Sequence, residues 1–320
     1  MPQQGRIVGL DIAKQKVDAC IRSLRLRLSQ PSTAAGQAAM IAWLHAHQVT
    51  TAVVEASGGY ERGWAAALRA AGIAVRVLDP KRVRHFAKSA GRLAKNDPID
   101  AEMIAWFGET FADAPSQSHD PDREELDGLL MARALLVKIA TQIGNHGEHA
   151  PPPVVAEAFA AIAASLAGQR ARLEAAIAAK LASTQRFADQ AEIIQSIPGL
   201  ARQAAAGVIA WLPELSRIGH KPAAALVGAA PYDDDSGRRQ GERHIKGGRA
   251  EIRELLYIVT LGCVTRHNPV LKAYYQRLRA RGKAFKVALI ACLRKLVVIL
   301  GAMLRRGEKW DVSRYAAAAV

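Results

Sequence analysis

The chain has 320 residues, half of them hydrophobic, and a formal net charge of +15. It is long enough for two or three domains, and its charge predicts binding to a polyanion, most simply nucleic acid or an anionic membrane surface. Cys20, Cys263 and Cys292 are far apart and form no CxxC pair. This spacing argues against a zinc site and predicts buried free thiols in a reducing compartment.

No apolar signal segment begins the chain, and the apolar run LVVILGAML after Lys295 is shorter than a bilayer span. We therefore expect a cytoplasmic protein that makes no contact with a membrane. Residues 201–320 carry 22 Lys and Arg against 9 Asp and Glu. This C-terminal third is expected to make much of the contact with a polyanion.

Strands and helices alternate in the first hundred residues. Stretches at 6–13, 17–23 and 24–30 predict three consecutive strands, and 36–47 predicts a helix capped by Ser32 or Thr33. The runs TAVVEAS and IAVRVLDP predict two further strands, each followed by a helix, and a last helix begins near Asp97. This order predicts an α/β domain, residues 1–112, around a mixed sheet.

Residues 113–190 are expected to form a linker and a helical hairpin. The segment DAPSQSHDP has the composition of a linker. The stretches 123–146 and 156–183 have helical apolar spacing, and the prolines of APPPVV separate them because proline cannot continue a helix. Two long helices joined in this way predict a coiled-coil arm for dimerisation or partner binding. An ordinary helical subdomain is the alternative.

Residues 191–320 are expected to form a mostly α-helical domain. The stretch SIPGLARQAAAGVIAWL resembles a helix-hairpin-helix element, which offers backbone N–H groups to phosphate, although a plain loop has the same pattern. Residues 250–306 predict three helices with Lys and Arg on one side. Their stretch YYQRLRARGKAFK interleaves aromatic and basic residues, which suits stacking and phosphate contact or a solvated basic face.

Four carboxylates in the first domain are candidates for a metal site. Asp11 lies in an apolar strand, where a charge is costly unless it is paired or bound to metal. Glu55 ends a buried strand, and Asp97 and Asp100 begin the last helix behind the basic run KRVRHFAKSAGRLAK. Acids so placed form the ribonuclease-H-like arrangement, which holds one or two divalent cations, and Mg²⁺ prefers such oxygen ligands.

Three of these acids also have simple structural explanations. Asp97 before Pro98 has the pattern of a helix cap. Asp100 would then lie in the first turn, where the helix dipole favours an anion. Glu55 could form an ion pair at the end of its strand. The pattern alone leaves both interpretations open.

The stretch GAAPYDDDSGRRQGERHIKGGRAEIRELLY is polar and glycine-rich within an otherwise helical, apolar region. Its serine, Ser236, is a candidate nucleophile for a phosphodiester, because neighbouring cations would stabilise charge that develops on phosphate. A flexible surface loop is the alternative. The basic residues expected to contact nucleic acid are Arg238, Arg239, Arg243, Lys246, Arg249, Lys283 and Lys286.

Seven segments in order resemble the insertion-sequence transposases of the IS-one-ten family, relatives of the pilin-gene DNA invertases. They are GLDIAKQKVD, VVEASGGYE, KNDPIDAEMIA, SIPGL, GAAPYDDDSG, IKGGRAEIRELLY and GKAFKVALIACLRKL. The resemblance covers nearly the whole chain and implies a DEDD, RuvC-like domain joined by a coiled coil to a serine-bearing transposase domain, residues 191–320. By position, Asp11, Glu55, Asp97 and Asp100 match the metal-binding acids and Ser236 matches the nucleophile.

The resemblance also implies DNA strand exchange through a phosphoserine-linked intermediate, with Mg²⁺ at the acids. It implies a homo-oligomer, dimer or tetramer, whose composite site combines acids of one subunit with the serine of another. A noncoding guide RNA from the element would select donor and target DNA. The alternatives are a Holliday-junction-type nuclease that uses the acids and water, and a non-catalytic nucleic-acid-binding protein. The role of Ser236 separates the first from a transposase, and the presence of all four acids argues against the second.

Overall fold

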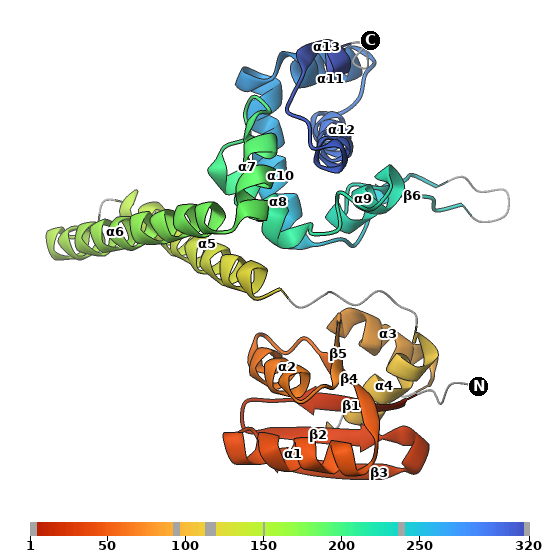
Figure 1. Ribbon diagram of the computed structural model, residues 1–320. Coiled ribbons are helices and arrows are strands. Elements are labelled where there is room, and N and C mark those ends of the chain that lie inside the picture. The colour runs from red at the N-terminus through yellow and green to blue at the C-terminus, as the bar shows by residue number, and fades with distance from the viewer. Residues whose placement is uncertain (1–4, 92–96, 113–119, 150, 236–240, 317–320) are drawn as a thin grey trace. The chain divides into compact units, whose positions relative to one another are not determined.

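The computed structural model describes residues 5–91, 97–112, 120–149, 151–235 and 241–316, apart from the side chains of 97–99 and 316. The chain divides into two compact units, Met1–His119 and Asp120–Val320. Unit 1 combines a sheet with helices, whereas unit 2 is almost entirely helical (Figure 1). Each unit has a hydrophobic core of its own.

Unit 1 is built on a five-stranded mixed sheet in the order β3-β2-β1-β4-β5. The strands are β1 (Arg6–Ile12), β2 (Lys16–Ile21), β3 (Leu26–Pro31), β4 (Val49–Glu55) and β5 (Ala74–Leu78). The first three form an antiparallel meander, while β1, β4 and β5 run parallel. The predicted strands and the mixed sheet are therefore confirmed.

Helices cover both faces of this sheet (Figure 1). They are α1 (Ala34–Ala46), α2 (Tyr60–Ala70), α3 (Pro80–Ser89) and α4 (Asp97–Thr110), and a 3₁₀ turn (Arg22–Leu24) precedes β3. On one face Leu10 and Val54 pack with Met40 of α1 and Trp64 of α2. On the other face α3 and α4 pack on β4 and β5 in a second apolar cluster.

Glycine lets α4 approach the sheet closely. A Cβ at Gly9 would lie only 2.3 Å from the carbonyl oxygen of Ala101 and the amide nitrogen of Ala105. At the far end of α4, the Glu109 carboxylate accepts a hydrogen bond from Arg22 at 2.9 Å. Arg22 lies just beyond the end of β2, and because β2 is antiparallel to β1, this position is beside the start of β1. The helix therefore runs antiparallel to β1, and its first turn lies toward the end of that strand.

Unit 2 contains nine α-helices in its described residues and one short hairpin. The helices are α5 (Pro121–Gly147), α6 (Pro153–Ser183), α7 (Gln185–Gln195), α8 (Arg202–Trp211), α9 (His220–Val227), α10 (Ala250–Gly262), α11 (Pro269–Ala280), α12 (Phe285–Arg306) and α13 (Val312–Ala316). A π-helical turn (Cys263–His267) follows α10, and the hairpin consists of β6 (Pro231–Tyr232) and β7 (His244–Ile245). The two predicted long helices are present as α5 and α6, while their coiled-coil packing stays a prediction.

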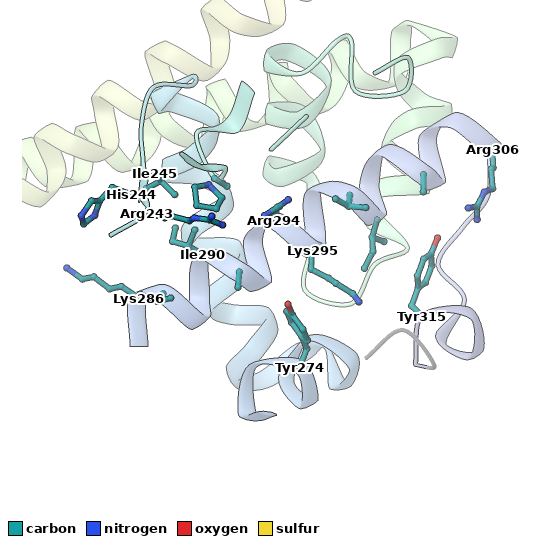
Figure 2. Close-up of a pocket in the computed structure, with 17 residues that line it drawn as sticks. Arg243, His244, Ile245, Tyr274, Lys286, Ile290, Arg294, Lys295, Arg306 and Tyr315 are labelled. Carbon is teal, nitrogen blue, oxygen red and sulfur yellow. The ribbon is translucent and has the colours of Figure 1, made fainter. Parts of the chain in front are cut away.

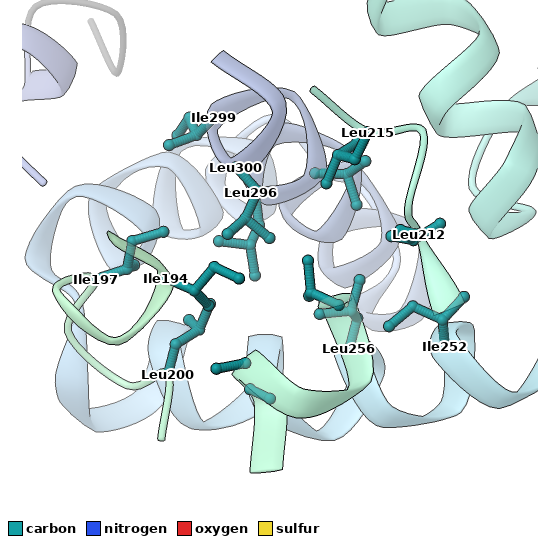
Figure 3. Packing of buried hydrophobic residues seen from close by; sticks show 14 of the residues in the cluster. Ile194, Ile197, Leu200, Leu212, Leu215, Ile252, Leu256, Leu296, Ile299 and Leu300 are labelled. Atoms are coloured by element: carbon teal, nitrogen blue, oxygen red, sulfur yellow. The ribbon is translucent and has the colours of Figure 1, made fainter. Parts of the chain in front are cut away.

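Helix α12 lies in the core of unit 2. Its Leu296 and Leu300 pack with Ile194, Leu215 and Leu256 from other helices and loops (Figure 3). The apolar run LVVILGAML belongs to this 22-residue helix, which is long and apolar enough to cross a membrane by length and composition alone. However, 56% of its most apolar window is buried inside the unit, as in a core helix.

All three cysteines are buried free thiols, as predicted. Cys20 lies in β2, and Cys263 and Cys292 belong to the core of unit 2. Burial raises the pKa of Cys263 to about 11 and that of Cys292 to about 12. These two thiols are therefore protonated at neutral pH and serve packing.

Candidate active site and nucleic-acid interface

Asp11 and Glu55 lie at the carboxyl ends of neighbouring parallel strands. β1 and β4 pair with Leu10 opposite Val54, and the two acids are the next residues of these strands. Because side chains alternate along a strand, Asp11 points to the same face as Gly9, which meets α4. Glu55 shares its face with Val53, which also packs with α4. The fold thus brings both acids to one face and one end of the sheet.

The first turn of α4 lies toward the same end of the sheet. Asp100 directly precedes Ala101, whose carbonyl oxygen faces Gly9 two residues before Asp11. Asp97 begins the helix, and its side chain lies outside the described residues. The carboxylates of Asp11, Glu55 and Asp100 therefore come from three elements that meet at one edge.

Carboxylate oxygens are the ligands that Mg²⁺ prefers in proteins, so the donor type at this edge fits a hard divalent cation. Among the side chains that the structure describes, no group of three or more His, Cys, Asp or Glu could hold a metal ion. Asp11, Glu55 and Asp100 belong to these described side chains and do not form such a group by themselves, whereas Asp97 lies outside the set. A four-acid site would thus depend on a side chain beyond the described ones.

Asp18 is a neighbour of this edge that sequence reasoning missed. It stands directly opposite Asp11 on β2, and opposite residues of an antiparallel pair point to the same face. Its carboxylate pairs with Lys16 at 3.1 Å, and its side chain is 13% exposed. Only the register of the two strands reveals this proximity, and the segment KVDAC gives no sign of it.

Glu61 shapes the loop that follows Glu55. Its carboxylate accepts hydrogen bonds from the backbone N–H groups of Ser57 at 2.9 Å and Gly59 at 2.8 Å, and from the Ser57 hydroxyl at 3.1 Å. Burial alone would raise the pKa of Glu61, but these hydrogen bonds outweigh it and hold the pKa below its usual value. Gly58 and Gly59 have φ of +71° and +107°, a region that favours glycine. This buried acid therefore fixes the strand end that carries Glu55.

We expect Glu61→Gln to lower the free energy of unfolding by about 1–2 kcal/mol at pH 7, because the charged acceptor of three hydrogen bonds is lost. The folded-state pKa is depressed, so the stabilisation is present above the unfolded pKa of about 4.3 and is lost as the pH falls through the folded value. Urea unfolding at pH 7 and at about pH 3 measures this. Glu157→Gln, in an exposed part of α6, is the control. If Glu61→Gln lowered the free energy of unfolding equally at both pH values, the stabilising role of the charged Glu61 carboxylate would be contradicted.

The predicted nucleophile Ser236 lies outside the described residues, as do Arg238 and Arg239. The residues on either side of them are described: Pro231 pairs with Ile245 and Tyr232 with His244. Residues 233–243 therefore connect the two strands of one hairpin. At the base of this connection Arg243 pairs with Asp233 at 2.7 Å.

The remaining predicted nucleic-acid contacts fall into two groups. Arg243, Lys246, Lys283 and Lys286 are exposed, whereas Arg249 is held inside unit 2. The guanidinium of Arg249 bonds both carboxylate oxygens of Glu214, at 2.5 and 3.0 Å. Burial alone would raise the pKa of Glu214, but the bonds from Arg249 outweigh it and lower the pKa. We therefore assign Arg249 to packing: it ties the start of α10 to the segment after α8.

Arg249→Gln and Lys246→Gln are expected to separate these two roles. The first removes a half-buried bidentate pair, so we expect it to lower the free energy of unfolding by about 2 kcal/mol. The second removes one exposed charge and is expected to weaken nucleic-acid binding while leaving stability within about 0.5 kcal/mol. Thermal unfolding and fluorescence anisotropy with DNA measure the two effects. Unchanged stability in Arg249→Gln would contradict the structural role.

Comparison with known proteins identifies the family of this chain. Residues 8–149, which include most of β1 and all of β4 and α4, match the DEDD, IS110-type family model described as a transposase. Residues 191–276, which include the β6–β7 hairpin, match the model described as "Transposase IS116/IS110/IS902 family". The chain is thus a transposase by class. It belongs to the IS110 family of insertion-element transposases.

Curated relatives point to the same family. The chain is 23% identical to the pilin gene-inverting protein of Moraxella lacunata over 95% of this chain and 97% of that protein. It is 26% identical to the uncharacterized 43.6 kDa protein of insertion element IS110 from Streptomyces coelicolor, over 67% of this chain and 54% of that protein. With the 44.8 kDa protein of insertion element IS116 from Streptomyces clavuligerus the identity is 35%, over 39% and 32% of the two chains.

Proposed function

We propose that this transposase cuts and rejoins DNA strands with a metal site formed by Asp11, Glu55, Asp97 and Asp100 and with Ser236 as the nucleophile. The observation that carries the proposal is the placement of Asp11 and Glu55 at the ends of adjacent parallel strands, on the face where α4 begins. The strand order β3-β2-β1-β4-β5, with β2 antiparallel to its neighbours, supports a RuvC-like, ribonuclease-H-like domain. One or two Mg²⁺ ions, when bound, would polarise the phosphodiester that reacts.

The serine chemistry balances without an external energy source. The Ser236 hydroxyl loses its proton and attacks phosphorus, the bond from phosphorus to a sugar oxygen breaks, and that oxygen leaves as a strand-end hydroxyl. A hydroxyl of another strand then attacks the phosphoserine and releases the serine. Each step exchanges one phosphate ester for another, so strands are rejoined and not only cut. Cations near the serine would stabilise the charge that develops on phosphate.

Several partners follow from this proposal. Arg243, Lys246, Lys283 and Lys286 would contact DNA or a noncoding guide RNA, together with Arg238 and Arg239. A homo-oligomer, dimer or tetramer, would combine the acids of one subunit with the serine of another in the cytoplasm. The α5–α6 hairpin supports self-association because it exposes large apolar side chains, including Leu135 at 57% and Val154 at 72%.

Metal removal tests the proposed chemistry. A plasmid that carries the DNA flanking the gene is incubated with the protein and RNA transcribed from the same flanks. We expect rejoined products with Mg²⁺, none in excess EDTA, and recovery when Mg²⁺ is restored. DNA binding should persist in EDTA, because Lys and Arg supply most of the affinity. Rejoined products formed in EDTA would contradict the metal site, and cutting without rejoining would favour the water-using nuclease.

A further inference from the structure

A cavity of about 740 Å³ lies within unit 2, lined by α11, α12 and the β6–β7 hairpin. Figure 2 shows Arg243 and His244 of the hairpin and Lys286 of α12 at one end of it, and Arg306 and Tyr315 at the other. Its volume is in the range of sites that hold a small organic ligand. Its hairpin end adjoins residues 233–243, the connection that contains Ser236.

The wall that α12 contributes is a continuous apolar stripe. Val287, Ile290, Ala291, Val298 and Ala302 line the cavity at spacings of three, one, seven and four residues, which place them on one face of a helix. Val287 is 56% exposed and Val298 36% exposed. The stripe is therefore an apolar surface that the described part of the chain leaves open.

Basic groups surround this wall. Arg243, Lys286, Arg294, Lys295 and Arg306 all line the cavity, and its described lining contains no Asp or Glu. The Nζ atom of Lys295 lies 5.2 Å from the centre of the Tyr274 ring, which is part of the same lining. Burial, followed by repulsion from Arg277, lowers the pKa of Lys295. The cavity thus combines a flat apolar surface, one aromatic ring and a surplus of positive charge.

We infer that this cavity binds an unpaired stretch of the DNA substrate, with a base against the apolar stripe and Tyr274 and its phosphates at Arg294, Lys286 and Arg243. The inference rests on the proposed function and adds how a strand would reach the serine. Channels for single strands combine a positive groove with surfaces on which bases stack. A DNA duplex keeps its paired bases inside the double helix, so its phosphates would contact the cations while the apolar wall stayed uncovered.

The charge of the cavity argues against a second copy of this chain as its occupant. An apolar protein segment would cover the stripe but would bring no negative charge to Lys286 and Arg294, so burying these two cations beneath it would be costly. A nucleic-acid strand supplies one negative charge per nucleotide beside each base, so it matches both features at once. We commit to DNA because the chain belongs to a transposase family, and the test below compares a DNA strand with an RNA strand of the same sequence.

The test measures binding of the full-length protein in EDTA, where no strand is cut, by anisotropy of labelled oligonucleotides of about 12 nucleotides, within the site sizes of single-strand grooves. The probes are a DNA strand, the same backbone without bases, the DNA duplex and an RNA strand of the same sequence. For wild type we expect the DNA strand to bind about tenfold tighter than the baseless strand. The DNA strand should also bind at least as tightly as the RNA.

Two variants test whether the preference for the strand with bases arises in this cavity. Ala291→Trp fills the apolar wall without a change of charge, and we expect it to remove the preference for bases while binding of the baseless strand stays within about twofold. Arg294→Gln should weaken both strands by a similar factor. The matched controls are Ala42→Trp on an exposed part of α1 and Lys138→Gln on an exposed part of α5. Both should bind like wild type.

Equal binding of the normal and baseless strands by wild type would overturn the inference, and that comparison needs no variant to fold. If Ala291→Trp still bound the normal DNA strand more tightly than the baseless strand by the wild-type factor, the inference would be overturned too. RNA binding that is about tenfold tighter than DNA binding would also overturn it. A loss of oligomer mass in Ala291→Trp with unchanged strand binding would show an interface between copies instead. If the duplex binds but the normal and baseless strands bind equally well, this inference alone fails. If no nucleic acid binds at all, the proposed function fails with it.

Discussion

Asp11→Asn is expected to lower the rates of DNA cleavage and rejoining by at least about 10³-fold, while DNA affinity stays within about twofold. Metal-ion stabilisation of a transition state is worth several kcal/mol, and each 1.4 kcal/mol is about tenfold in rate. Asp11 is the second-last residue of the central strand β1 and lies beside the strand that carries Glu55, so in the proposed site its charge would help to hold the ion. Gel assays of cleavage and anisotropy of DNA binding measure the two quantities separately.

Asp18→Asn is the matched control for this result. It removes a carboxylate from the position directly opposite Asp11, and this carboxylate pairs with Lys16 at 3.1 Å. We expect it to retain at least about a tenth of the wild-type rate, because Asp18 is not among the four proposed metal ligands. Full activity in Asp11→Asn would refute the metal site, and an equal collapse in both variants would show that Asp18 belongs to it.

Ser236→Ala is expected to abolish rejoining to the limit of detection while DNA and RNA binding persist. No other group at that position could carry the phosphoryl ester, and water would release its energy. Mixed with Glu55→Gln protein, the same variant should recover part of the activity. In a mixed oligomer, intact acids of one subunit would meet the intact serine of the other.

This complementation is measured by adding the two inactive proteins to one reaction, with each alone as the control. A mixture of Ser236→Ala with Asp11→Asn should behave in the same way, since the acids are again supplied by the other subunit. A mixture of Asp11→Asn with Glu55→Gln should stay inactive, because no subunit then has both acids. Activity in that last mixture would contradict the composite site.

Much of the fold follows from local patterns in the sequence. Alternating and β-branched runs predict β1 to β5, and an acid within the first strand, Asp11, with another at the end of a later parallel strand, Glu55, predicts that the two lie near each other. Asp18 was missed because its proximity depends on the antiparallel register of β1 and β2. Such a register is a property of paired strands and is not visible in either strand alone.

Side-chain roles that depend on tertiary contacts were harder to predict. Arg249 stands among exposed cations in the sequence, yet its guanidinium is held by Glu214, 35 residues away. The cavity of unit 2 arises only when α11, α12 and the β6–β7 hairpin pack together. Glu61 had a local signal, since an acid four residues after Ser57 and two after a Gly-Gly pair can cap the loop.

Isolation of a protein–DNA adduct tests the central claim most directly. Wild-type protein is incubated with its DNA, RNA and Mg²⁺, denatured, and digested with protease and nuclease, and the peptides are sequenced by mass spectrometry. The account predicts a peptide in which Ser236 carries a phosphodiester-linked nucleotide, absent from Ser236→Ala and from Asp11→Asn. Rejoined DNA formed by wild type without any such peptide, or by Ser236→Ala at the wild-type rate, would contradict it.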